Sequence, residues 1–308
     1  MANLTEVSQW ESVIRQIENG EAATGGADGL ANVQAKQLAN RTQYLKGQIS
    51  TINTYIYNMP TNGTFLNHNG IFRGINLGVL DSLSAVEGFL NEHNVSSGGF
   101  DDLYLGDYFT IKDGTYNAEW EIVGFNVYYC KGDTEFNNNH VVLMPKKNLL
   151  TSKMNNTDDT TGGYHGSYIH QTVIPTIDDK LATILREHLL SRRAFLSDRV
   201  DKSVTGGSGA NLGGASSGGN WYTVKSCLAS EVAIYGSRIF SSSPFDIGED
   251  SERLPLFQFR HNSYSRQWFW LRGVAAGNAF VLANGMGSSN TFNATKENVG
   301  VLPIICVG

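Results

Sequence analysis

The sequence predicts an α+β protein in which an N-terminal helix and a coiled-coil shaft lead into a globular head of mixed helices and strands. Three observations favour this fold class. An apolar stripe with coiled-coil spacing follows a glycine-rich start, and later runs are short and rich in aromatic and β-branched residues. Only 17% of the residues are charged and 34 are glycine, a composition typical of strands and loops. The expected parts are a docking segment at 1–30, the shaft at 31–60, a small bead or linker at 61–99 and the head at 100–308.

Residues 1–20 predict a short amphipathic helix that ends at Asn19-Gly20. Its apolar face consists of Leu4, Val7, Trp10, Ile14 and Ile17. A helix of this length is not stable on its own in water. We therefore expect it to dock, either within a homo-oligomer or onto a larger assembly.

In residues 31–59, apolar side chains recur at alternating steps of four and three, the 3.5-residue period of a coiled coil. This seam consists of Ala31, Ala35, Leu38, Thr42, Leu45, Ile49, Ile52, Ile56 and Met59. Its flanks are polar, so self-association is favoured over the alternative, a helix packed on its own domain. With Leu38 and Leu45 taken as position a and Ile49 and Ile56 as position d, the sequence favours three or four strands over two.

Pro60 ends the shaft helix, and a further helix is expected in "DSLSAVEGFLNEHN", where Ser84 and Glu87 have capping-box spacing. In the head, "DYFTI", "AEWEIVGFNVYYC" and "HVVLMP" predict strands, and "TIDDKLATILREHLL" predicts a helix. The stretch "VTGGSGANLGGASSGGNW" is expected to be a loop. Of the later apolar runs, "QWFWLRGV" should bury Trp270 and Leu271, and "VGVLPIICVG" is expected as an inner strand.

The start of the shaft has the form "GG.DGLAN.QA..LA.RT.YLK..I" over residues 25–49. The residues that carry this form are Gly25, Gly26, Gly29, Ala31, Asn32, Gln34, Ala35, Leu38, Arg41, Thr42, Leu45 and Lys46. The segment resembles those near the front of many bacteriophage tail-fibre and tail-collar proteins. The resemblance implies that residues 1–30 dock on the virion and that the shaft is a homotrimer.

The head contains "FDDLYLGDYFTI", "HVVLMPKKNL", "MNNTDDTTGGYHGS", "LASEVAIYG" and "GVLPIICVG". These stretches resemble an uncharacterised C-terminal module of phage and prophage proteins from gut bacteria. That module is related in pattern to lectin-like modules of the C-type lectin kind, which close with a Gly-Val-Arg-Pro turn. Leu302 stands where the arginine often does, so no role carries over from that side chain. The resemblance implies a virion context and a lectin-like head, and no reaction chemistry.

Composition and charge exclude several classes of protein. A formal net charge of −6 argues against a nucleic-acid-binding surface, which needs clustered Lys and Arg. Cys130, Cys227 and Cys306 are far apart and odd in number, so we expect reduced thiols and no disulfide framework. No run is long and apolar enough for membrane insertion, and the N-terminus lacks the features of a signal peptide. We expect synthesis in the host cytoplasm and no export by a classical signal.

Metal and catalytic sites are not indicated by the motifs. The histidines His140, His165 and His170, with Asp158 and Asp159, lack the spacing of a zinc-binding helix. The acidic groups of "FDDLYLGD" (Asp101, Asp102, Asp107) and "PFDIGEDSE" (Asp246, Glu249, Asp250, Glu252) hold carboxylates of the kind that a glycosidase pairs, but the sequence gives no pairing. No nucleotide-binding loop or nucleophile elbow occurs. We therefore expect no enzyme activity, metal or cofactor, and keep a surface-glycan hydrolase as an alternative.

Binding is the remaining role for the head. Between Arg260 and Asn298, aromatic residues alternate with Asn, Ser and Arg, a mixture that suits a ligand surface. The candidate receptor-binding residues are Tyr264, Arg266, Asn278, Asn284, Asn290 and Phe292. The hypothesis is a trimeric phage receptor-binding appendage that attaches to a bacterial surface glycan. The alternatives are a purely structural virion protein (head fibre, collar or baseplate adaptor) and the hydrolase.

Overall fold

The computed structural model describes residues 5–26, 28–57, 68–205, 213–243, 245–247, 253–259 and 267–308, with the backbone alone for residues 52–57. The chain divides into two compact units, Met1–Gly63 and Thr64–Gly308. The division falls a few residues after the predicted end of the shaft. The second unit contains all the sheets and is the head.

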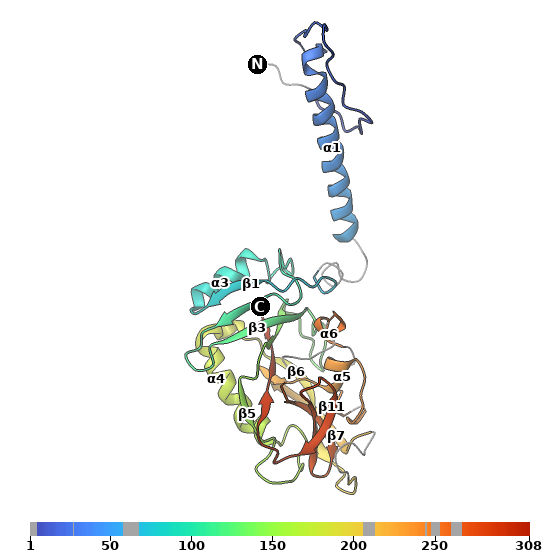
Figure 1. The fold of residues 1–308 in the computed structure, drawn as a ribbon. Helices are drawn as coiled ribbons and strands as arrows, with labels where there is room; N and C mark the ends of the chain where they lie inside the picture. Colours follow the sequence, from blue (N-terminus) through green and yellow to red (C-terminus); the bar gives the residue numbers. More distant parts are fainter. Residues whose placement is uncertain are drawn as a thin grey trace. The chain divides into compact units, whose positions relative to one another are not determined.

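The first unit is built on one long helix, α1 (Leu30–Tyr57). Its bounds agree with the predicted rod as far as the described residues reach. The amphipathic helix predicted before it is wrong, because residues 5–17 contain no helical turn. They form an extended segment that runs antiparallel along α1, so that Arg15 bonds to Gln37 and Trp10 lies against Tyr44 (Figure 1). We call residues 5–17 the N-terminal strap.

The head is a mixed α+β unit dominated by sheets, which confirms the coarse fold class. A six-stranded sheet has the order β1-β2-β3-β4-β13-β8, a five-stranded sheet has the order β11-β10-β9-β12-β5, and β6 and β7 form a two-stranded ribbon. The strands of the first sheet are β1 (Asn76–Leu80), β2 (Tyr108–Ile111), β3 (Ala118–Phe125), β4 (Val141–Pro145), β8 (Ser226–Leu228) and β13 (Pro303–Val307). The others are β5 (Leu150–Ser152), β6 (Arg192–Val200), β7 (Ser216–Val224), β9 (Phe269–Ala276), β10 (Ala279–Ala283), β11 (Ser289–Asn293) and β12 (Val299–Val301).

Short helices accompany these sheets. They are α3 (Leu83–Glu92), a π-helical turn (Ile169–Val173) that continues into α4 (Ile174–Leu185), a 3₁₀ turn (Arg186–His188), α5 (Glu231–Tyr235) and α6 (Leu256–Phe259). The cap of α3 is Ser82, whose hydroxyl accepts a hydrogen bond from the Ala85 backbone N–H, and not the predicted Ser84. The cap therefore lies two residues earlier than the capping-box spacing of Ser84 and Glu87 suggested.

The predicted bead at 61–99 is not separate within the described residues. Strand β1 pairs in parallel with β2, and α3 packs against β1 and α4. Residues 68–99 are therefore an edge of the head's main sheet. Figure 1 shows β1 and α3 together at one end of the head.

The core confirms several predicted burials. Trp270 and Leu271 are fully buried, although their neighbours on β9 are buried too, so both faces of this strand are covered. β13 lies between β4 and β8, which makes it an inner strand as expected. All three cysteines are free, and Cys227 and Cys306 are buried on these neighbouring strands.

Strand β7 was missed. β7 begins at Ser216, within the stretch that was expected to be a loop; residues 206–212 of that stretch lie outside the described part. Gly218 and Gly219 are in this strand because side chains of β6 lie over them: a Cβ on Gly219 would come within 2.7 Å of the Phe195 ring. The glycines serve a close approach, and not a turn.

Candidate functional site

The apolar seam of α1 is exposed in the single chain. Leu38, Leu45 and Ile49 have 53%, 49% and 59% of their surface exposed. Ala31, Ala35 and Thr42 are exposed as well. The side chains of Ile52 and Ile56, and the whole of Met59, lie outside the described residues. Every seam residue whose side chain is described is thus open to solvent, which is costly for a helix stripe of this kind.

The N-terminal strap covers a different face of α1. The Val7 N–H donates to Asn40 Oδ1 at 2.8 Å, and Asn40 Nδ2 donates to Glu11 Oε1 at 2.8 Å. Arg41 Nε donates to the Glu11 carbonyl at 2.6 Å. Asn40 is therefore buried in the middle of the helix, and both the oxygen and the nitrogen of its side-chain amide are used in hydrogen bonds to the strap.

The strap and the seam do not compete for the same side of the helix. Gln37, Asn40 and Tyr44 contact the strap, and they are spaced three and four apart, which puts them on one stripe. That stripe is turned away from the stripe of Leu38 and Leu45. The helix therefore has one face held by its own chain and one apolar face left open.

The predicted docking residues do not form the face of a helix. Val7, Trp10 and Ile17 are exposed on the strap, and Ile14 is half-buried. Leu4 lies outside the described residues. Trp10 lies 6.0 Å from the Tyr44 ring, with the Arg41 guanidinium 4.9 Å from its centroid. The segment binds to the shaft helix and presents apolar side chains on its outer side.

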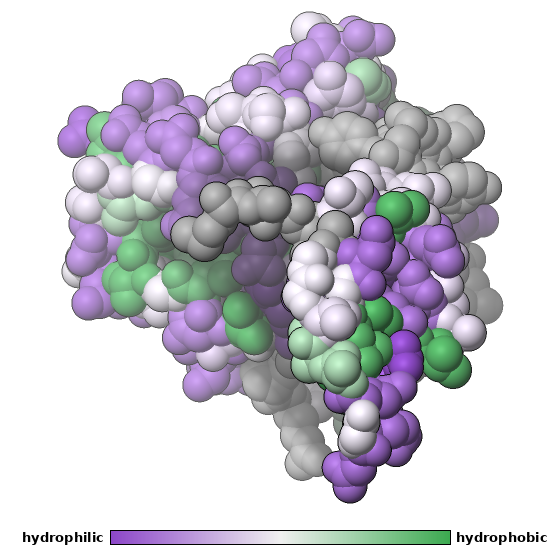
Figure 2. Space-filling view, turned by 90° about the horizontal axis from the view of Figure 1, so that it is seen from above, coloured by the Kyte–Doolittle hydropathy of each residue, from purple (hydrophilic) through white to green (hydrophobic). Residues whose placement is uncertain are grey.

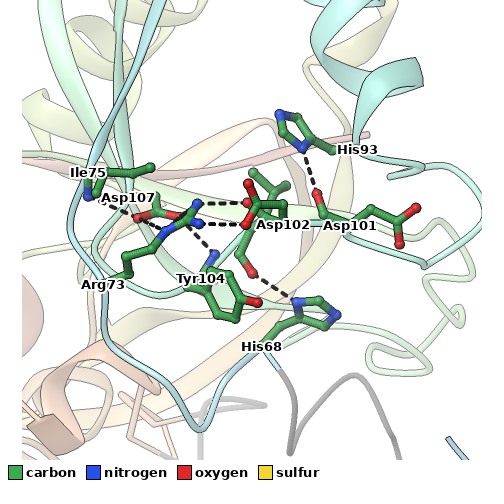
Figure 3. Close-up of polar contacts among 9 residues, drawn as sticks. His68, Arg73, Ile75, His93, Asp101, Asp102, Tyr104 and Asp107 are labelled. Atoms are coloured by element: carbon green, nitrogen blue, oxygen red, sulfur yellow. Dashed lines mark hydrogen bonds and ion pairs between the residues drawn. The ribbon is translucent and has the colours of Figure 1, made fainter. Parts of the chain in front are cut away.

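The most highly connected polar group of the head surrounds Arg73 (Figure 3). Its Nε and Nη2 donate to the Asp107 carboxylate at 2.8 to 3.2 Å, and its Nη1 donates to Asp102 Oδ1 at 2.6 Å. The backbone N–H groups of Ile75 and Tyr104 complete the ligation of Asp107, which is fully buried. The hydrogen bond to Asp107 raises the pKa of the Arg73 guanidinium above its usual value. This group, which we call the junction anchor, fastens the first residues of the head to the 101–107 loop.

The carboxylates that a glycosidase could have used are occupied in structural contacts. Both oxygens of Asp107 are saturated by the junction anchor. Asp246 is buried and accepts hydrogen bonds from the Ser216 hydroxyl and the Ser242 N–H, and burial raises its pKa to about 6. Glu249, Asp250 and Glu252 lie outside the described residues. The described members of the two acidic groups hold loops in place.

Of the candidate metal-binding histidines, His140 is bonded to the backbone, and His165 and His170 lie beside each other. His140 is buried, and its ring nitrogens lie 2.8 Å from the Asn138 carbonyl and 3.3 Å from the Tyr128 N–H. His165 and His170 have ring centroids 5.3 Å apart. In the part of the chain that the structure describes, no three His, Cys, Asp or Glu side chains are placed to hold a metal ion.

Asp158 and Asp159 have other partners. Asp158 Oδ2 accepts hydrogen bonds from the side-chain amides of Asn278 and Asn293. Asp159 accepts from the Thr161 hydroxyl and pairs with Lys202 at 3.0 Å. These contacts pin the 155–161 loop to the end of the β10–β11 hairpin and to the loop that follows β6.

The predicted receptor-binding residues do not form one patch. Asn278 precedes β10 and Asn284 follows it, so the two lie at opposite ends of the hairpin. Asn284 Oδ1 accepts the N–H groups of Met286 and Ser288, and closes the turn. Asn290 lies on β11 and its side chain accepts the neighbouring Thr291 N–H. Tyr264 and Arg266 lie outside the described residues.

Phe292 has a packing role that the sequence did not indicate. Its ring centroid lies 5.3 Å from that of Trp268, and Lys296 Nζ lies 4.9 Å from it. Both rings are half-buried and contact the core. Phe292 and Trp268 support the connection between β11 and β12, and Phe292 is on a strand and not in the loop that was expected.

Comparison of the chain with protein-family models, with curated proteins and with solved structures found no match. None of the described helices has the length and apolarity that a bilayer span requires. Function is therefore argued from the contacts described above.

The junction anchor predicts a large difference between two neighbouring substitutions. Arg73→Ala should lower the free energy of unfolding of the head by about 3 kcal/mol, because it leaves Asp107 buried without its cation. Asp102→Ala should cost less than about 1 kcal/mol, because 73% of that side chain is exposed. Urea unfolding measures both, with the exposed Arg238→Ala as control. Equal effects of Arg73→Ala and Arg238→Ala would contradict this account.

His170 predicts a pH dependence. Burial lowers its pKa to about 4, below the value near 6.5 of an unfolded chain. Unfolding therefore takes up a proton between these values, and the contribution of His170 to stability is lost as the pH falls from about 6.5 towards 4. Relative to wild type, His170→Leu should gain about 2 kcal/mol between pH 7 and pH 4.5 in urea titrations. A wild-type-to-variant difference that is the same at both pH values would refute the assignment.

Proposed function

We propose that the protein is a non-enzymatic bacteriophage virion appendage, a homotrimer joined along α1, whose lectin-like heads bind a glycan of the bacterial host surface. One observation carries the proposal: α1 leaves its apolar seam exposed while its other face is covered by the strap. The likeness of residues 25–49 to phage tail-fibre and tail-collar segments supports the virion context.

A second copy of the same helix is the partner that fits the seam. The stripe repeats every seven residues from Ala31 onward, and only a helix with the same repeat can follow it over several turns. The strap strengthens this argument, because the chain already uses its own N-terminal residues elsewhere on the helix. Self-association then covers the open face and leaves each strap on the outside of the shaft.

The heptad register bears on the number of copies. In a heptad, position d follows a by three residues, and the three-residue steps here run from Ala35 to Leu38, from Thr42 to Leu45 and from Ile49 to Ile52. Position a is therefore the set that contains Ile49, and d is the set that contains Leu38, the reverse of the first assignment. β-branched residues at a with Leu at d suit two strands, whereas the Ile49 and Ile52 layers suit three. The proposal of three copies is thus supported by the C-terminal half of the shaft and by the family resemblance.

The start of the head carries further exposed apolar side chains. Ile71, Ile75 and Val79 have 49%, 44% and 45% of their surface exposed. Val79 is on β1, the edge strand of the six-stranded sheet. Figure 2 shows hydrophobic residues at several places among hydrophilic ones on the face that it draws. These exposed apolar side chains suit contact with the head of another copy in the proposed trimer.

The strap also favours the structural alternative, in which the protein is a head fibre, collar or baseplate adaptor. Val7, Trp10 and Ile17 remain exposed on its outer side, and these side chains suit docking on another virion protein. Docking through the strap is compatible with both functions. The two differ in whether the heads bind cells.

The seam predicts the state of association. Wild-type protein should sediment at three times 33.7 kDa, and the double substitution Leu45→Asp with Ile49→Asp should sediment as a monomer, because charges cannot be buried between the helices. The matched control is Gln43→Asp with Ser50→Asp, which adds the same charges at exposed positions beside the seam. Trimers that survive the seam substitutions would show that α1 does not hold the assembly, and a stable dimer in wild type would overturn the trimer.

Attachment is tested with labelled protein on a panel of gut bacteria. The trimer should bind the surface of a susceptible strain, and the monomeric seam variant should bind at least about 10-fold more weakly because its sites act singly. Binding to no strain, with antibody label confined to the particle, would favour the structural alternative. Depolymerisation of the surface polysaccharide would identify the hydrolase.

A further inference from the structure

A polar and aromatic group lies over the β6–β7 ribbon, outside the seam, with Tyr222 packed against the core. It consists of His165, Asp198, Arg199, Asn220 and Tyr222, which we call the ribbon surface. In Figure 1, β7 lies at the end of the head opposite to β1 and α3.

The "GGYHGS" loop is pressed against the ribbon by its glycines. Gly163 has φ +61°, and a Cβ there would lie 2.5 Å from the Ser197 carbonyl oxygen. The His165 N–H donates to that same carbonyl at 2.9 Å, and the Tyr164 N–H donates to the Ser197 hydroxyl at 3.2 Å. These two hydrogen bonds and the close approach of Gly163 fix His165 above the ribbon.

His165 lies face to face with Tyr222. Their ring centroids are 3.5 Å apart at an interplanar angle of 14°. Tyr222 Oη donates to Asp198 Oδ2 at 3.0 Å, and Asn220 Nδ2 donates to the same oxygen. The stacked rings and the amide hold the Asp198 carboxylate in one orientation at the surface, where 14% of its side chain is exposed.

The ribbon surface has hydrogen-bonding capacity in reserve. Arg199 donates to Asp198 through Nε at 3.3 Å, and among the described residues no contact engages its two terminal nitrogens. Its side chain is 66% exposed and lies over Gly218, where a Cβ would come within 2.2 Å of Nε. Asn220 is exposed, and its Oδ1 accepts no hydrogen bond within the described part of the head. His165 Nδ1 is buried and likewise has no partner there.

The charge of the ribbon surface sums to zero near neutral pH. Asp198 and Arg199 cancel, and burial lowers the pKa of His165, so its ring is neutral. An ionised ligand would gain little from such a group. A ligand with adjacent hydroxyls can instead accept from Arg199, donate to Asp198 and exchange hydrogen bonds with Asn220.

We propose that the ribbon surface binds a neutral sugar unit of the host glycan, with Asp198, Arg199 and Asn220 contacting its hydroxyls. The inference rests on the proposed attachment function and names the site and ligand class for it. The pre-oriented carboxylate gives direction to the hydroxyl contacts, while the small Asn220 amide and the exposed Arg199 guanidinium can adapt to the ligand. The sugar-binding residues are then different from those that the sequence favoured.

The test is a printed array of neutral and acidic oligosaccharides probed with the trimeric wild-type protein. The hits are then titrated against wild type and the variants Arg199→Ala, Asn220→Ala and Tyr222→Phe. We expect the wild type to bind neutral glycans. Arg199→Ala and Asn220→Ala should lower the affinity at least tenfold. Tyr222→Phe should lower the affinity less, because it removes only one of the hydrogen bonds that orient Asp198. Arg238→Ala and Ser217→Ala, both exposed and outside the ribbon surface, are the controls and should bind as wild type does.

The outcomes separate the site from the function. Arg199 and Asn220 are exposed, so their variants should fold, and an unchanged melting temperature and sedimentation verify this. Undiminished glycan binding or cell attachment in these variants overturns the ribbon site and leaves the attachment function in place. Binding to acidic glycans only overturns the ligand class. A wild-type trimer that binds neither array nor cells overturns the attachment function and the ribbon site with it.

Discussion

The arrangement of the first unit depends on the two faces of α1. In water, a 28-residue helix with an apolar stripe is stabilised when the stripe is covered. The strap covers the polar face of α1 and leaves the apolar stripe exposed. Its hydrogen bonds to Gln37, Asn40 and Arg41 contribute about 1 kcal/mol each. Ordering an extended segment costs a comparable amount for every residue fixed. A neighbouring molecule that buried Val7 and Trp10 would therefore stabilise the strap.

Carboxylates in the head fall into two kinds that the sequence does not distinguish. Asp107, Glu231 and Asp246 are buried and accept several hydrogen bonds each, mostly from backbone N–H groups of loops. Such groups organise long irregular connections that a sheet protein with little helix must hold in place. Asp198 differs, because its bonds come from side chains at the surface and it stays in contact with solvent. The first kind is buried and holds loops in place, whereas Asp198 of the second kind remains open to an external hydrogen-bond donor.

Elements with a long, local repeat in the sequence could be predicted. Segments whose conformation depends on contacts with residues far away in the sequence could not. The seam repeats over four turns and more, so α1 and its stripe could be read directly. The segment that contains Val7, Trp10 and Ile14 has helical spacing too. However, Asn40 accepts a hydrogen bond from the Val7 N–H and donates one to Glu11, which is 29 residues away, and these contacts favour a non-helical backbone. Arg73 and Asp107 are 34 residues apart and no local pattern links them.

Two of the candidate receptor residues have local hydrogen bonds that the sequence did not indicate. Asn284 and Asn290 were chosen because amides beside aromatic residues suit ligands, yet amides suit turns and strand ends equally well, and Asn284 closes a turn. The glycines of "GGYHGS" and of β7 were read as loop signals. In the structure they permit close contacts, of Gly163 with Ser197 and of Gly218 with Arg199, and these contacts build the ribbon surface. A glycine that serves a close approach cannot be told from one that serves a turn until the partner strand is known.

Under the proposed function, the shaft and the ribbon surface act together to attach the protein through several weak contacts. A ligand group that lies on a two-stranded ribbon, with one partly exposed carboxylate and one exposed guanidinium, buries little of a sugar and cannot hold it tightly. Tight binding by one head is not required if the seam joins several heads, because after the first contact the others bind at a high effective concentration. A neutral ribbon surface also avoids steering the head towards any charged polymer, so selection among hosts is left to the geometry of hydroxyl groups. Under that proposal, joining the heads along the seam makes a weak site sufficient, and a weak site in turn requires that the heads be joined.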